Sequence, residues 1–129
     1  MYATLDVSFF SYLDRPIFEI TLNGLELGAA PAHGFYGANG MRVDERIQLG
    51  PQIVSWRLGG PRGMARNGET VRAKNAPLLD KVPPNTKWLA LHIYDDDTVE
   101  IALSKRDTDE LETERGKKII AEWEKKHGR

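Results

Sequence analysis

The segment HGFYGANGM, residues 33–41, spaces three glycines evenly among aromatic side chains, which raises the question of phosphate binding. A dinucleotide-binding loop needs Gly-x-Gly-x-x-Gly between a strand and a helix, so that the helix N-terminus faces the phosphate. Here the glycines recur at every third position, and residues 41–46 (MRVDER) carry no apolar helical stripe. Phosphate binding is therefore disfavoured. Two interpretations stay open: a structural loop whose glycines adopt positive φ, or a loop that contacts a partner.

Other residues with catalytic or metal-binding side chains lack the spacing that such chemistry requires. His33, His92 and His127 fit no zinc motif, and no Gly-x-Ser-x-Gly nucleophile elbow is present. The sequence contains no cysteine, which excludes thiol catalysis and thiolate metal sites. The run 95–97 (DDD) lacks a calcium-binding ladder and is typical of a tight acidic turn. We expect no cofactor and no metal, and the residues alone leave an enzyme possible but unsupported.

A second loop, GGPRGMARNG at residues 59–68, lies in a basic part of the chain. Residues 42–88 carry nine basic and four acidic residues, whereas the whole sequence has a net charge of −1. This basic region is either a solvated surface or a face that meets an acidic partner. One short loop without interleaved aromatic residues is a weak signal for RNA, and we therefore expect no nucleic-acid partner.

The elements that position these loops are mostly strands, because alternation of apolar and polar residues dominates the first ninety positions. Asn23-Gly24 is a hairpin signal, and the acidic run 95–97 separates two strongly alternating segments. Residues 28–50 show no strong period and are predicted to be a long loop with a short strand near 46–49. The other strands are expected at residues 4–12, 17–23, 25–27, 52–58, 69–74, 88–94 and 98–104.

The periodicity then changes to that of a helix, predicted from about 113 to 127. Ile119 and Trp123 are spaced i,i+4, Thr113 or Asp107 is a suitable N-cap, and Gly128 suits the C-terminal end. Gly116 costs about 1 kcal/mol relative to Ala in a helix interior, which predicts a frayed first turn. The fold class expected is a mainly β protein: an antiparallel β-sandwich, immunoglobulin-like or transthyretin-like, with a C-terminal α-helix, forming one domain over residues 1–129.

Several stretches resemble bacterial immunity lipoproteins that bind phospholipase A1-type effectors of type VI secretion. The most specific are the AHGFYG loop and the run SWRLGGPRGMARNGETVRAKN (55–75). Three further segments also resemble this family, namely residues 5–24, 89–103 and 113–128, so that the resemblance extends over almost the whole chain. The resemblance implies a non-enzymatic protein that binds and neutralises a phospholipase effector and thereby protects the membranes of the producing cell. It also implies a periplasmic lipoprotein, anchored to the membrane by a lipid on a cysteine that these 129 residues lack.

If the protein acts in this way, the two loops are the expected contact surface. Exposed aromatic residues without a strand or helix period would supply apolar anchors, and the basic loop would add charge-assisted contacts. The predicted partner-binding residues are His33, Phe35, Tyr36, Asn39, Met41, Arg62, Met64 and Arg66. Joint action requires both loops to lie at the same end of the sandwich. The alternatives are an envelope β-sandwich binding module with another ligand, or a small hydrolase with an unrecognised carboxylate pair.

Overall fold

The computed structural model describes residues 1–36, 39–106 and 111–128. Strands make up 44% of the chain and helix 12%, which confirms the predicted mainly β fold with a C-terminal helix. The elements described are β1 (Tyr2–Ser11), β2 (Ile17–Leu22), β3 (Leu25–Ala30), β4 (Met41–Gln48), β5 (Gly50–Pro51), β6 (Val54–Leu58), β7 (Thr70–Arg72), β8 (Leu78–Leu79), β9 (Trp88–Ile93), β10 (Val99–Ser104) and α1 (Glu114–His127).

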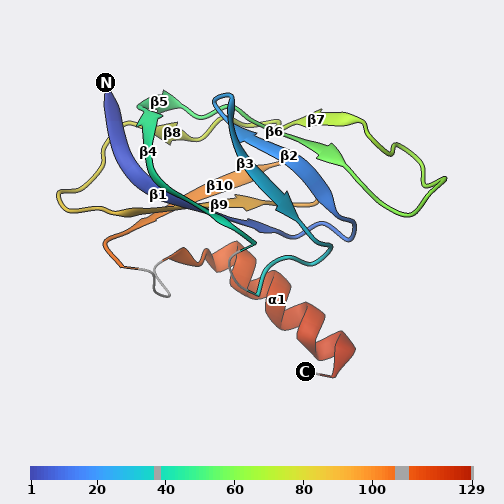
Figure 1. Ribbon diagram of the computed structural model, residues 1–129. Helices are drawn as coiled ribbons and strands as arrows, with labels where there is room; N and C mark the ends of the chain where they lie inside the picture. The colour runs from blue at the N-terminus through green and yellow to red at the C-terminus, as the bar shows by residue number, and fades with distance from the viewer. Residues whose placement is uncertain (37–38, 107–110, 129) are drawn as a thin grey trace.

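The strands form two stacked sheets, and α1 lies on the outer side of one of them (Figure 1). In the described residues, the first sheet has the order β10-β9-β1-β4 and the second β3-β2-β6-β7, while β5 and β8 pair separately. The predicted hairpin β9–β10 is present, with Val99 opposite Ile93. The pair β1–β9 is parallel, unlike the antiparallel pairs around it. The first sheet is therefore mixed, with its parallel pair at the centre.

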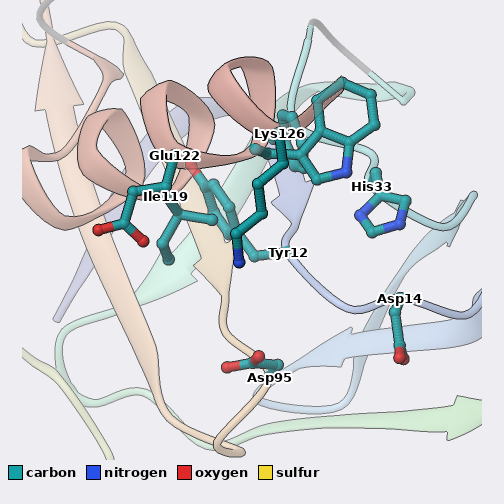
Figure 2. Close-up of a pocket in the computed structure, with 9 residues that line it drawn as sticks. Tyr12, Asp14, His33, Asp95, Ile119, Glu122 and Lys126 are labelled. Atoms are coloured by element: carbon teal, nitrogen blue, oxygen red, sulfur yellow. The ribbon is translucent and has the colours of Figure 1, made fainter. Parts of the chain in front are cut away.

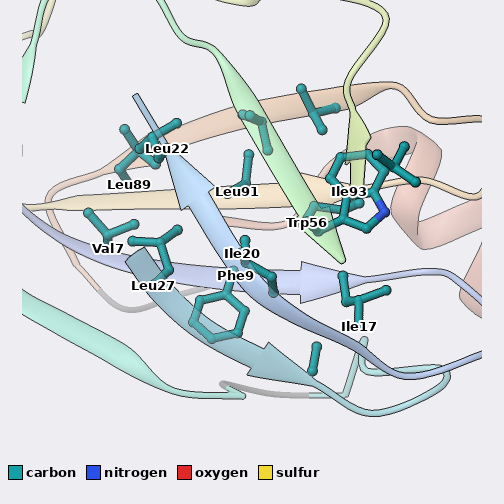
Figure 3. Packing of buried hydrophobic residues seen from close by; sticks show 14 of the residues in the cluster. Val7, Phe9, Ile17, Ile20, Leu22, Leu27, Trp56, Leu89, Leu91 and Ile93 are labelled. Atoms are coloured by element: carbon teal, nitrogen blue, oxygen red, sulfur yellow. The ribbon is translucent and has the colours of Figure 1, made fainter. Parts of the chain in front are cut away.

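The main core lies between the two sheets and is built by the alternation seen in the sequence. Val7 and Phe9 of β1 and Leu91 of β9 point toward β2 and β6 (Figure 3). Trp56 of β6 is fully buried against them. Burial of each large apolar side chain contributes roughly 1.5–3 kcal/mol, so this layer supplies most of the folding free energy.

The opposite face of the first sheet is also covered, because every residue of β9 after Trp88 is buried. Leu89, Leu91 and Ile93 belong to the core between the sheets, whereas His92 stacks on Phe10 and bonds to the Leu111 carbonyl just before the helix. Sheets built of parallel strands usually have both faces shielded from water. The helix therefore completes the burial of the central parallel pair.

The prediction of a long loop over residues 28–50 is wrong at both ends. β3 continues to Ala30, and β4 begins at Met41, well before the short strand expected near 46–49. A β-bulge in the β1–β4 pairing interrupts the alternation of β4. At the bulge, Asp44 has a φ of 54° and its N–H donates to the buried Asp6 carboxylate at 2.8 Å. Because the bulge breaks the strict alternation of apolar and polar residues, a search for that alternation does not detect the strand.

The helix begins and ends at the predicted caps. The Thr113 hydroxyl accepts a hydrogen bond from the Gly116 N–H at 2.9 Å, and Gly128 ends the helix with a φ of 70°. Asp107, the other candidate cap, lies outside the described residues. The first turn is not frayed, because Gly116 is buried and packs against the Tyr12 hydroxyl. Glycine is needed there because a Cβ would collide with that hydroxyl.

We therefore expect Gly116→Ala to destabilise the protein by roughly 1–3 kcal/mol, the usual cost of overpacking, although helix propensity alone predicts a gain of about 1 kcal/mol. Chemical denaturation monitored by circular dichroism measures the free energy of unfolding. Ala121→Gly, on an exposed position of the same helix, should cost about 1 kcal/mol through propensity alone. The cost of Gly116→Ala should shrink in a Tyr12→Phe background, which lacks the hydroxyl. A more stable Gly116→Ala variant would contradict this account.

Candidate functional site

The basic loop, residues 59–68, is held in shape by the side chain of Arg15. The guanidinium donates from Nε to the Gly59 carbonyl at 2.8 Å and from Nη2 to the Ala65 carbonyl at 3.1 Å. Nη2 also donates to Asn67 Oδ1 at 3.0 Å, and Asn67 Nδ2 donates to the Pro61 carbonyl at 2.8 Å. A loop with these bonds is ordered before any partner arrives.

Three predicted contact residues lie on this loop, and all three are exposed. Met64 retains 38% of its accessible surface. Arg66 forms two hydrogen bonds with the Glu69 carboxylate, at 2.9 and 2.8 Å, which lower the pKa of Glu69. The Arg62 guanidinium forms no ion pair with any residue that the structure describes. Arg62 and Met64 are thus the members of the trio that a partner can reach without breaking an internal contact.

The other predicted loop differs from expectation at its central aromatic residue. Phe35 was expected to be an exposed anchor, but it is only 4% exposed and packs against Tyr12 and Trp123. The loop folds beneath α1, which removes this ring from solvent. Tyr36 is 49% exposed, and Met41 is 44% exposed at the start of β4 rather than in the loop.

The polar and small residues of this loop have structural roles. Asn39 Nδ2 donates to the Gly34 carbonyl at 2.8 Å and to the Phe9 carbonyl at 3.1 Å, which ties the loop to β1. A Cβ on Gly34 would lie 3.0 Å from the Pro31 carbonyl oxygen. Gly40 has a φ of 150° and abuts the Phe9 ring. A positive φ is therefore present at Gly40 but not at Gly34, and residues 37 and 38 lie outside the described residues.

The two loops share one neighbour, the connector of residues 12–16 between β1 and β2. His33 donates its backbone N–H to the Leu13 carbonyl at 2.8 Å, and Gly59 donates to the Pro16 carbonyl at 2.9 Å. Both loops are therefore anchored to the same short segment, which is consistent with the requirement that they lie at one end of the sandwich.

An aromatic cluster fills the space between the first sheet and α1. The rings of Tyr12 and Tyr94 stack at 4.8 Å, and Phe10 stacks on His92 at the same distance. From the helix, Trp123 contacts the rings of four residues, namely His33, Phe35, Tyr36 and His127. Trp123 thus joins the loop of residues 31–36 to the helix, and Ile119 and Ile120 pack against the same cluster.

His92 is buried at the centre of the cluster with both ring nitrogens bonded. Nε2 lies 2.7 Å from the Leu111 carbonyl, which only accepts, and therefore Nε2 carries the hydrogen. In the neutral ring, Nδ1 then accepts from the Tyr12 hydroxyl at 2.8 Å. Desolvation lowers the pKa of His92 and favours this neutral form, and burial raises the pKa of Tyr12.

A second chain of hydrogen bonds fixes the start of the helix. The Tyr94 hydroxyl donates to the Glu100 carboxylate at 2.6 Å, so the Thr113 hydroxyl, also 2.6 Å away, donates to the Tyr94 oxygen. The Arg115 guanidinium lies 4.0 Å from the Tyr94 ring centroid and bonds to Asp96 at 2.9 Å. The first turn of α1 is thereby fixed to the sheet by polar contacts on two sides.

Beyond this first turn, a groove of about 420 Å³ opens between α1 and the connector (Figure 2). We call it the helix groove. Its aromatic and apolar lining consists of Tyr12, His33, Phe35, Ile119 and Trp123, and its charged lining of Asp14, Asp95, Glu122 and Lys126. Four segments far apart in the chain contribute these residues. In the part of the chain that the structure describes, no group of three or more His, Cys, Asp or Glu residues is arranged to hold a metal ion.

Of the eight predicted partner-binding residues, the groove includes only His33 and Phe35. Sequence reasoning missed the other members because no short motif contains them. The sequence signal that could have pointed to the groove is Trp123, an aromatic residue among the charged residues of EWEKKH. The predicted acidic turn at residues 95–97 is present, but its first carboxylate also lines the groove.

Because burial lowers the pKa of His92 below the ordinary value of 6.5, the unfolded chain takes up the proton more readily than the folded protein. The contribution of His92 to the free energy of unfolding is fully present above pH 6.5 and decreases as the pH drops below that value. We expect the free energy of unfolding to decline more between pH 7.5 and 5.5 in the wild type than in His92→Gln. Denaturant titrations at several pH values measure this difference. The exposed His127→Gln should retain the wild-type decline, and equal slopes in wild type and His92→Gln would refute the assignment.

Compared with models of protein families, with curated proteins and with solved structures, the chain matches none of them.

Proposed function

We propose that this protein is a binding protein that neutralises an enzyme by occlusion, namely an immunity protein for a type VI secretion phospholipase effector. The observation that carries the proposal is the basic loop, which Arg15 holds in one shape while Arg62 and Met64 face solvent. A loop that is ordered before binding loses less conformational entropy on association, which favours tight inhibition. Arginine and methionine are also enriched at protein interfaces relative to the rest of the surface.

The resemblance of the sequence to immunity lipoproteins supplies the partner and the compartment of this proposal. The partner is a phospholipase with an α/β-hydrolase nucleophile elbow, and the site of action is the periplasm, with membrane attachment through a lipid. Within the described residues, no helix is long and apolar enough to span a membrane. In this proposal the protein carries out no chemistry and needs no cofactor.

One structural observation bears on the hydrolase alternative. Three carboxylates, from Asp14, Asp95 and Glu122, line the helix groove together with aromatic side chains. A carboxylate pair for general acid–base catalysis would lie here. Turnover of ester and glycoside substrates that is lost in single Asn or Gln variants of these residues would favour the hydrolase over the binding protein.

The first test is a titration of the purified protein against the candidate phospholipase, with lipase turnover measured in the same tube. We expect stoichiometric binding and loss of turnover. The absence of binding at micromolar concentrations would overturn the proposal and favour an envelope binding module with another ligand.

The contact surface is tested by the double variant Arg62→Ala/Met64→Ala, which should weaken effector binding at least tenfold because both exposed side chains are removed. Arg72→Ala is the matched control, since Arg72 is an exposed arginine on β7, outside both loops. Tyr36→Ala tests the other loop, because Phe35→Ala would open a cavity in the aromatic cluster. If the double variant bound the effector with unchanged affinity, the basic loop would not be part of the interface.

A further inference from the structure

The helix groove is lined by aromatic side chains and by three carboxylates that have no hydrogen-bond or ion-pair partner among the described residues. Asp14 comes from the connector, Asp95 from the β9–β10 turn and Glu122 from α1. Among the described residues, none of these three side chains forms a hydrogen bond or an ion pair. The adjacent Asp96 shows the contrast, because its carboxylate is used internally by Arg115 and Thr98.

The protein places one cation of its own in this groove. Figure 2 shows the Lys126 side chain extending from α1 into the space above Asp95. Its ammonium forms no ion pair with the residues that the structure describes. With three carboxylates and one lysine, the formal charge of the lining is −2 when His33 is neutral. The groove therefore favours positive charge even with Lys126 in place.

The aromatic lining narrows the class of cation that fits. Among the rings that line the groove beside the carboxylates, that of Trp123 is half-buried, whereas those of Tyr12 and Phe35 are almost fully buried and stack on each other. A guanidinium group stacks on aromatic faces and also forms paired hydrogen bonds with carboxylates, whereas an ammonium is a compact and strongly hydrated charge. We infer that the helix groove accepts an arginine side chain of a partner protein, which displaces Lys126 from the space above Asp95.

This inference rests on the proposed function only for the identity of the partner, so the groove is first tested with a small probe. The probe is N-acetyl-arginine amide, followed by NMR, with N-acetyl-citrulline amide as the uncharged control of nearly the same shape. We expect saturable shifts of the Trp123 indole signal at millimolar arginine derivative, and binding of the citrulline derivative at least tenfold weaker. The buried Trp56 is an internal control whose indole signal should not move.

Variants then separate the charges of the groove. Asp95→Asn/Glu122→Gln should weaken probe binding at least tenfold, and Lys126→Met should strengthen it several-fold, because the competing cation is gone. Glu26→Gln, an exposed carboxylate on β3, should change nothing. Equal binding of the two probes, an unmoved Trp123 signal, or weaker binding in Lys126→Met would overturn the inference.

The phospholipase effector distinguishes failure of this inference from failure of the proposed function. Binding of the arginine probe without binding of the effector would support the groove and overturn the immunity function. Effector binding that is unchanged by Asp95→Asn/Glu122→Gln, with no probe binding, would support the immunity function and overturn the groove. A tenfold loss of effector affinity in this double variant, together with probe binding, supports both.

Discussion

Shielding the parallel pair β1–β9 from water on both faces is the constraint on which the rest of the structure depends. The second sheet covers one face with aliphatic side chains and Trp56, and α1 covers the other. Two polar side chains on the helix-facing side have partners near the start of the helix: His92 bonds to Leu111, and Tyr94 to Thr113. Because a buried polar group without a partner is costly, these bonds determine where the chain must lie as it enters the helix.

The same arrangement explains why a groove exists at all. At its first turn α1 approaches the sheet closely, since Gly116 has no side chain to separate it from Tyr12. Further along, the bulky Trp123 contacts the loop of residues 31–36, and the C-terminal end of the helix projects beyond the sheets (Figure 1). Space therefore opens between the second half of the helix and the connector, and charged residues line it.

Patterns within short stretches of the sequence predicted much of the fold but few of the residues that line the helix groove. The alternation of Leu89, Leu91 and Ile93 and the caps of α1 are encoded within short windows, and they are present as expected. The start of β4 was missed because a bulge held by Asp6 interrupts its period. The burial of Phe35 depends on a helix that begins about eighty residues later, and Asp14, Asp95 and Glu122 line one groove only through tertiary structure. Sequence patterns are read within windows of about 11–18 residues and cannot predict contacts between residues so far apart in the chain.

The connector of residues 12–16 has a consequence for how the surface responds to substitution. It hydrogen-bonds to both loops through Leu13, Arg15 and Pro16, and its Tyr12 lines the helix groove. Residues that share partners in one hydrogen-bonded network show coupling energies rather than additive effects. Substitutions that adapt one loop to an altered partner will therefore shift the other loop through the connector, and the two loops are expected to evolve as a correlated pair.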